Sequence, residues 1–250
     1  MEGTHTVAHQ GNFGTHPGGQ ERRRQSGRGD GPIARDGSPV ALYTRLAPQG
    51  EAEIVSSAVL VPSRILELGC GAGRVTRALA SLGHEVVAVD ESRDMLDGFP
   101  ALNVLSPVEK IHSSIEGLRL AASSFDGVVL ASQLINTINV VARKSMLDTC
   151  RHHVRPGGSI VIQRHDPSFL RDPIDRRAGK NRFIVRDIEQ CPDNVVGGVL
   201  EYHVDGHIWT QQIWVQKLSD DDLAECLRDS SLRLEEFLTS DRTWLRATPI

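Results

Sequence analysis

The sequence predicts an α/β protein built on a doubly wound parallel sheet. Short apolar strands alternate with amphipathic helices between residues 64 and 165. A glycine-rich turn joins the first of these strands to its helix, and residues 232–250 contain two further strands that form a closing hairpin. Strands and helices that alternate at this spacing are typical of a parallel sheet with helices on both faces.

The individual elements follow from hydrophobic periodicity and from capping residues. Five apolar stretches are predicted as strands, namely residues 64–68, 84–90, 109–113, 125–132 and 159–165. Residues 74–82 carry apolar side chains at i, i+3, i+4 and i+7, as an amphipathic helix does. Ser92 is expected to cap a second helix, and a third begins near Val140 and stops before Pro156.

The pattern changes after the fifth strand. Residues 166–217 contain three consecutive strand-like stretches, and the last two are joined by Asp205-Gly206, a strong hairpin signal. This segment is therefore predicted as an antiparallel insertion that overhangs the substrate side of the sheet. Ser219, with Asp222 three residues later, is expected to start the last helix.

Composition sets the domain organisation and the expected surroundings. Residues 1–37 have too few apolar side chains for a core, and we expect a disordered tail followed by one domain over residues 38–250. The net charge of −4 disfavours a nucleic-acid partner, and without a long apolar segment we expect a cytoplasmic monomer or homodimer away from membranes. The four cysteines lack metal-ligand spacing, so we expect buried thiols and no metal.

The glycine turn indicates a ligand site. Gly69, Gly71 and Gly73 lie between the first strand and its helix, where bare backbone and the helix N-terminus favour an anionic or carboxylate-bearing ligand. Arg74 replaces the third glycine of a dinucleotide-binding turn, and no Walker lysine follows. NAD and ATP are thereby disfavoured without being excluded. A tight turn without any ligand is the other interpretation.

An acidic residue at the end of the second strand extends this site. Asp90 follows Gly71 by 19 residues, and in a doubly wound sheet such a carboxylate lies beside the ligand crevice, where it can bind the hydroxyls of a ribose. Taken alone, Asp90 is equally consistent with an exposed strand-end carboxylate. Together, the turn and Asp90 favour a ligand with a carboxylate at one end and a ribose in the middle.

Four ordered motifs resemble one family. "LELGCGAGR", "VVAVDESRDML", "SFDGVVLAS" and "VRPGGSIVI" are similar to the motifs of class I S-adenosylmethionine-dependent methyltransferases, here of the small-molecule type. The resemblance runs from about residue 40 to the C-terminus and is weakest over 166–217. It implies a Rossmann-like seven-stranded sheet with an antiparallel last strand, and S-adenosylmethionine as the cofactor.

The resemblance also implies the cofactor-binding residues. The glycine loop would contact the methionine moiety, Asp90 the ribose, and Glu91, Met95 and Ile115 the adenine. At Ser114 the family commonly has aspartate, so the usual contact to the adenine amino group is in doubt. The full expected set is Tyr43, Glu67, Gly69, Cys70, Gly71, Gly73, Asp90, Glu91, Met95, Ser114, Ile115 and Ala131.

The acceptor side is expected after the fourth and fifth strands, because ligands of open α/β sheets bind outside the carboxyl ends of the strands. Ser132, Gln133 and Asn136 follow the fourth strand. His165 and Asp166 follow the fifth strand, and His165 is the candidate base because histidine titrates near neutrality. The alternative is that His165 is a polar strand-end residue bonded to the backbone.

The function predicted from these residues is methyl transfer to nitrogen or oxygen of a small-molecule acceptor, such as a natural-product or metabolic intermediate. No "NPPY"-like tetrapeptide follows the fourth strand, which disfavours methylation of nucleic-acid bases. Two alternatives stay open. One is an enzyme that retains the cofactor and catalyses another reaction, such as a cyclisation. The other is an S-adenosylmethionine-binding regulatory module.

Overall fold

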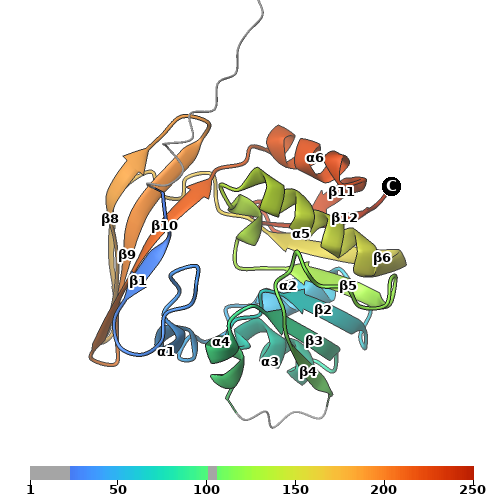
Figure 1. The fold of residues 1–250 in the computed structure, drawn as a ribbon, viewed down its shortest axis with the longest axis horizontal. Helices are drawn as coiled ribbons and strands as arrows, with labels where there is room; N and C mark the ends of the chain where they lie inside the picture. Colours follow the sequence, from blue (N-terminus) through green and yellow to red (C-terminus); the bar gives the residue numbers. More distant parts are fainter. Residues whose placement is uncertain (1–22, 101–105) are drawn as a thin grey trace, which may run out of the picture.

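The computed structural model describes residues 23–100 and 106–250, which form two β-sheets facing each other across a loop of the N-terminal segment (Figure 1). The larger sheet carries the helices, and the smaller sheet is antiparallel. The larger sheet is thus the doubly wound part that the sequence predicts. The smaller one contains the insertion.

The larger sheet has seven strands in the order β11-β12-β6-β5-β2-β3-β4. Their bounds are β2 Arg64–Leu68, β3 Glu85–Asp90, β4 Val108–His112, β5 Phe125–Leu130, β6 Val154–Gln163, β11 Leu232–Phe237 and β12 Trp244–Pro249. The chain moves from β2 outward through β3 and β4 and then returns to β5 on the other side of β2, so the order reverses between β2 and β5. β12 is antiparallel to β6. The predicted fold class is confirmed, including the antiparallel last strand.

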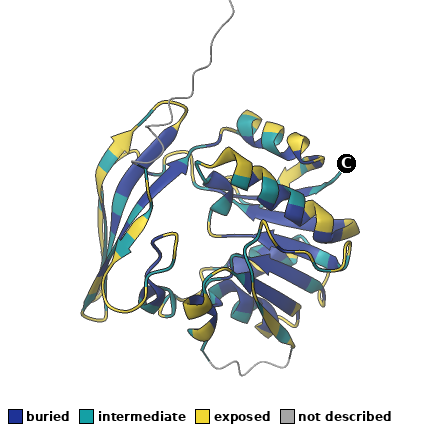
Figure 2. Ribbon diagram, in the orientation of Figure 1, coloured by how far each residue is buried: buried dark blue, intermediate teal, exposed yellow. Residues whose placement is uncertain are grey.

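Helices cover both faces of this sheet. α2 (Glu51–Ser57) and α3 (Arg74–Ser81) pack on one face, and α5 (Val140–His153) and α6 (Asp220–Asp229) pack on the other. A hydrophobic core lies on each face of the sheet, and alternate residues of a strand point into one or the other. In β2, Leu66 packs with α5, whereas Ile65 packs with α3. The central strands are therefore buried along most of their length (Figure 2), and their residues are apolar almost throughout.

The helix starts agree with the predicted capping. The Ser92 hydroxyl accepts the N–H of Met95 at 3.3 Å at the start of α4 (Arg93–Asp97). Ser219 and Asp222 form a complete capping box at the start of α6. Each such cap supplies a partner for a backbone N–H that the helix itself leaves unpaired, and is worth about 1 kcal/mol. α5 ends at His153, slightly earlier than predicted, because β6 begins directly at Val154.

The smaller sheet has the order β1-β10-β9-β8-β7. Its strands are β1 Ser26–Arg28, β7 Ile174–Ala178, β8 Asn181–Gln190, β9 Val195–Val204 and β10 His207–Gln216. The three longest are those that the sequence predicts, and Asp205-Gly206 forms the turn between β9 and β10. β7 was not predicted, because its five residues have three consecutive charged side chains between two apolar ones and so lack the alternation of a strand.

The N-terminal segment corrects the predicted tail. Residues 1–22 lie outside the described residues, but Ser26–Arg28 pair with β10, and Ile33 forms a bridge with Pro39. The prediction of disorder is therefore wrong over residues 23–37. The prediction was based on composition, which shows only that the segment cannot form a core of its own. The segment is ordered because it pairs with the open edge of β10. We call residues 23–39 the N-terminal arm.

Candidate functional site

The glycine turn lies at the point where the strand order reverses, between β2 and α3. Gly69, Gly71 and Gly73 have φ of 70°, 55° and 76°, which residues with a Cβ rarely adopt. A Cβ at Gly69 would lie 2.5 Å from Leu134 Cδ1, and one at Gly73 would lie 2.1 Å from Phe99 Cε1. At Gly71 the nearest atom would be Met95 Sδ at 3.9 Å. The turn therefore needs glycine both for its backbone and for close approach.

Hydrogen bonds tie this turn to the end of β3. The N–H groups of Gly69 and Cys70 donate to the Val89 carbonyl at 2.8 and 3.0 Å, and the Gly71 N–H donates to Asp90 Oδ2 at 2.8 Å. These amides are thus used within the protein, and the donors left for a ligand are those of the first turn of α3. This differs from a loop whose own amides all point at the ligand.

Asp90 is half-buried at the carboxyl end of β3. Its Oδ1 accepts the Ser92 N–H at 2.8 Å, which fixes the carboxylate on both sides. Burial raises the pKa of Asp90, and the two backbone N–H bonds oppose this shift. An ionised carboxylate has about four acceptor sites, so two remain for hydroxyl donors such as those of a ribose.

Glu67 is buried at the end of β2 and contacts α3 rather than open space. Its Oε2 accepts the Thr76 hydroxyl at 2.6 Å, and only 2% of the residue is exposed. Burial raises the pKa of Glu67 to about 7. The sequence implied Glu67 as a cofactor residue. In the structure its hydrogen bond with Thr76 holds α3 against β2, and the N-terminus of α3 faces the site.

Other residues of the predicted set gather around the same turn. Met95 packs with Ala72, Val40 and the half-buried Tyr43, while Cys70 packs under α4. Burial raises the pKa of the Tyr43 phenol and that of the Cys70 thiol. Both groups are therefore neutral near neutral pH, and this side of the site is apolar.

The loop after β4 closes the opposite side. Ile115 packs against the main core, and its Cδ1 would lie 3.7 Å from a Cβ at Gly69. The Ser114 hydroxyl accepts the Gly117 N–H at 3.1 Å and so closes a turn. The serine thus stabilises the loop where the family commonly has aspartate. Glu91 is exposed and forms an ion pair with Arg35 at 3.6 Å.

The segment after β5 has a strained backbone. Ser132 and Gln133 follow the buried Ala131 and have φ of 54° and 56°, although neither is glycine. The Ser132 N–H donates to Gln163 Oε1 at 2.8 Å. Residues held at positive φ cost of order 1–3 kcal/mol and are found where a side chain must be aimed, so this geometry supports the predicted acceptor side.

Asn136 is buried and joins three segments. Its Nδ2 donates to the Gln216 carbonyl at 2.8 Å, and its Oδ1 accepts the His165 N–H at 2.8 Å. Arg143 reinforces this junction, because its guanidinium donates to the Ile135 carbonyl and to Gln216 Oε1. Both polar ends of the Asn136 amide are thus engaged. The residue fixes the smaller sheet on the larger one, a role that the sequence analysis did not predict.

His165 and Asp166 make separate contacts. The His165 ring stacks on Phe169 with 3.8 Å between centroids, while the Asp166 carboxylate accepts the N–H of Ser168 at 2.7 Å. Burial lowers the pKa of His165 to about 3, and the charge of Lys217 adds to the effect. A histidine with such a low pKa is too weak a base to remove a proton from an acceptor efficiently near pH 7. The geometry favours the alternative of a strand-end histidine whose own N–H is bonded to a neighbouring residue.

A surface hollow adjoins His165 but lies apart from the glycine turn. Its lining residues come from the loop after β6, the turn before β9 and the start of α6: His165, Asp166, Pro167, Asn194, Lys217, Leu218 and Ser219. None of the predicted cofactor residues lines it. Within residues 23–100 and 106–250 no group of three metal-ligating side chains gathers, and no helix there is long and apolar enough to span a membrane.

Three contacts to the site escaped the sequence analysis. Leu134 covers Gly69, Phe99 covers Gly73, and Ala34 of the N-terminal arm packs with Ala72 and Met95. For Leu134, its position directly after the predicted acceptor residues was an available signal. No sequence signal pointed to Ala34, because the composition of its segment is typical of a disordered tail.

Comparison with known proteins agrees with this geometry. Residues 65–158 match the family model described as "Methyltransferase domain". A demethylmenaquinone methyltransferase of Clavibacter sepedonicus is 39% identical over 100 residues, which is 40% of each chain. A cypemycin N-terminal methyltransferase of a Streptomyces species is 32% identical over 127 residues, 48% of this chain and 51% of that protein. The chain thus matches about half or less of the length of these relatives.

The similarity in three dimensions extends further along the chain. The CcbJ methyltransferase from Streptomyces caelestis aligns with a TM-score of 0.67 and 19% sequence identity, over 82% of this chain and 92% of that one. At this identity the likeness shows a shared fold. It covers more of the chain than the sequence matches do.

Proposed function

We propose that this chain, whose residues 65–158 match the family model described as "Methyltransferase domain", is a class I S-adenosylmethionine-dependent methyltransferase that transfers a methyl group to nitrogen or oxygen of a small-molecule acceptor. The observation that carries the proposal is the joined pair of glycine turn and Asp90 at the reversal of strand order. Open α/β sheets bind their ligands at that position. The named methyltransferases among the relatives support the same activity.

The residues fit the cofactor. Gly69, Gly71 and Gly73 leave the backbone bare, and α3 begins there with unpaired N–H groups suited to a carboxylate. Asp90 keeps acceptor sites for ribose hydroxyls, and Ile115 with Met95 offers apolar surfaces for a ring. The bound cofactor supplies an activated methyl group on a sulfonium. The protein therefore has to hold the acceptor in line and exclude water.

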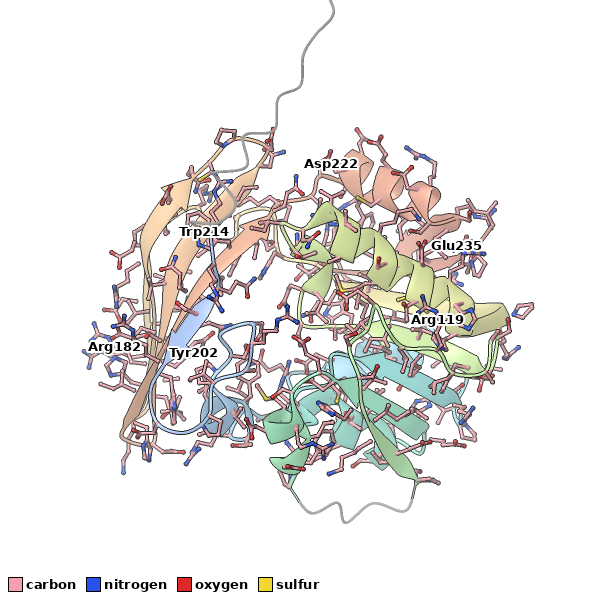
Figure 3. The ribbon with its side chains drawn as sticks, viewed as in Figure 1. Arg119, Arg182, Tyr202, Trp214, Asp222 and Glu235 are labelled. Atoms are coloured by element: carbon pink, nitrogen blue, oxygen red, sulfur yellow. The ribbon has the colours of Figure 1, made fainter. Side chains whose placement is uncertain are left out.

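The acceptor would enter between the two sheets. Cross-strand partners Phe183, Tyr202 and Trp209 lie on one face of the smaller sheet, and the buried Gln211 lies on the same face. Arg182, on the opposite face, is directed to the outside of the sheet (Figure 3). An aromatic face with few charges suits a small organic molecule, and it supports a natural-product or metabolic acceptor.

Calorimetric titration with S-adenosylmethionine and S-adenosylhomocysteine tests the cofactor assignment. We expect binding of both at micromolar concentrations. The acceptor is then sought by incubation with trideuteromethyl-labelled S-adenosylmethionine and mass spectrometry of added small molecules. Failure of the purified full chain to bind either compound would contradict the proposal.

A further inference from the structure

A turn at the tip of the N-terminal arm lies between the two sheets. The Gly37 N–H donates to the Ala34 carbonyl, and the Ala34 N–H donates to the Ser38 carbonyl, both at 2.9 Å. Figure 1 shows this loop between β1 and α1 (Val40–Tyr43) in the space that separates the sheets. The residues at the tip are Arg35 and Asp36.

The arm contacts the smaller sheet on one side. The buried Trp209 donates its indole N–H to the Asp30 carbonyl at 2.9 Å. Gln211 Nε2 donates to the Ser38 hydroxyl at 3.2 Å. These bonds fix the arm to β10, on the face that also holds Tyr202.

On its other side the arm contacts the cofactor edge of the larger sheet. Arg35 pairs with Glu91 at 3.6 Å, and Ala34 packs against Ala72 and Met95. The tip is therefore within reach of both the predicted ribose site and the acceptor face. A side chain at the tip is placed where the acceptor and the cofactor would meet.

Asp36 is the charged group that this arrangement adds to the site. Its Oδ1 accepts the Ser38 N–H at 3.0 Å and its Oδ2 accepts the Ser38 hydroxyl at 2.8 Å. Burial raises the pKa of both Asp90 and Tyr43, and the negative charge of Asp36 adds to each shift. Asp36 is exposed at the tip of the arm, and its charge acts on both of these groups. Among the ion pairs of residues 23–100 and 106–250, none involves Asp36.

We propose that Asp36 binds the cationic amine of the acceptor, so that this enzyme methylates nitrogen. The inference rests on the proposed function and narrows it. A carboxylate without a cationic partner beside a second carboxylate creates a negative potential that favours a cation and repels an anionic acceptor. Charge-assisted bonds to an ammonium are also stronger than bonds to a hydroxyl.

The weakness of His165 as a base favours the same choice. A hydroxyl acceptor usually needs a base at the attacking oxygen, and the candidate His165 has a pKa of about 3. The ammonium is the form that Asp36 attracts, and the neutral amine in equilibrium with it is the form that reacts: one proton passes to bulk solvent before the site closes, and the nitrogen lone pair then forms the C–N bond. The methyl C–S bond breaks, and its electron pair goes to sulfur. The methylated ammonium leaves with its remaining protons, so no further base is required.

The sulfonium of the cofactor is a second possible cation, and binding measurements separate the two sources. S-adenosylmethionine carries the sulfonium charge, whereas S-adenosylhomocysteine does not. For Asp36→Asn we expect the affinities for both to stay within about 2-fold of wild type, since neither supplies the acceptor amine. A selective loss of S-adenosylmethionine affinity would assign the contact to the sulfonium and overturn the proposal.

The acceptor is tested with matched probes: 2-amino-2-deoxyglucose against glucose, and trialanine against N-acetyltrialanine. We expect methylation only of the members with a free amine. Asp36→Asn keeps the oxygen that accepts the Ser38 N–H but loses the charge, and it should lower kcat/KM by about 30-fold, mainly through KM. Asp30→Asn, on the same arm, is the control and should change kcat/KM by about 2-fold at most.

Each other outcome is decisive. Methylation of glucose or of the acetylated peptide, or an Asp36→Asn variant as active as wild type, would overturn the amine assignment. So would a wild-type protein that binds S-adenosylmethionine but methylates neither amine probe, and the cofactor assignment would then still stand. Absence of cofactor binding would instead remove the proposed function itself.

Discussion

Asp90 Oδ2 accepts the backbone N–H of Gly71 at 2.8 Å, which joins the end of β3 to the glycine turn after β2. The residue expected to bind the ribose therefore also determines the shape of the turn expected to bind the methionine moiety. Since one side chain serves both parts, a change at Asp90 should affect the whole cofactor site.

Replacement of Asp90 by asparagine tests this connection. Asp90→Asn removes the charge and leaves one acceptor oxygen for two backbone N–H groups. We expect the binding of S-adenosylhomocysteine to weaken by about 1–3 kcal/mol, or ~5–150-fold, in calorimetry. Asp94→Asn, on the exposed side of α4, is the matched control. Equal affinities for both variants and wild type would place Asp90 outside the site.

Glu67 should make stability depend on pH. Its pKa is raised by burial from 4.5 to about 7, so between these values the folded state binds more protons than the unfolded state. The resulting stabilisation is complete below about pH 4.5 and is lost as pH rises through about 7, with a maximum of about 3 kcal/mol. Chemical denaturation at pH 5 and pH 8 measures the difference.

Glu67→Gln keeps an acceptor for the Thr76 hydroxyl but cannot titrate. We expect this variant to lose less stability than wild type between pH 5 and pH 8. The exposed Glu53 provides the control, since Glu53→Gln should preserve the wild-type slope. Parallel pH profiles for wild type and Glu67→Gln would show that Glu67 does not titrate in this range.

His165 should be dispensable as a base. His165→Phe preserves the ring that stacks on Phe169 and the backbone N–H that donates to Asn136. Because the pKa of His165 is about 3, we expect kcat/KM for methyl transfer to remain within about 3-fold of wild type from pH 6 to pH 9. A loss of 100-fold or more, with unchanged cofactor affinity, would restore the catalytic assignment.

Removal of the first part of the N-terminal arm, residues 23–31, should destabilise the protein. Deleting residues 1–31 removes β1 and the carbonyl that accepts the indole N–H of the fully buried Trp209. A loss of about 2 kcal/mol would lower Tm by roughly 4–8 °C in calorimetry. A deletion that ends at residue 22 keeps every described contact of the arm and is the control. An unchanged Tm after the longer deletion would mean that the arm is not held in solution.

The sequence by itself determined the larger sheet and the cofactor edge. Periodicity over residues 64–165 is local: a buried strand is apolar along its length, a helix repeats about every four residues, and caps such as Ser92 lie next to what they cap. The glycine turn and Asp90 could be found because each follows directly from the end of a strand. The family motifs consist of these same local signals.

Only the tertiary structure decided which residues surround the proposed acceptor side. The arm is ordered because β10 offers it an edge nearly two hundred residues away in sequence, and this pairing places Asp36 beside the proposed acceptor site. Asn136 connects the two sheets because it is hydrogen-bonded both to Gln216 and to His165. The low pKa of His165 comes from burial under distant segments. Such properties depend on which surfaces meet after folding, and no local pattern of residues encodes them.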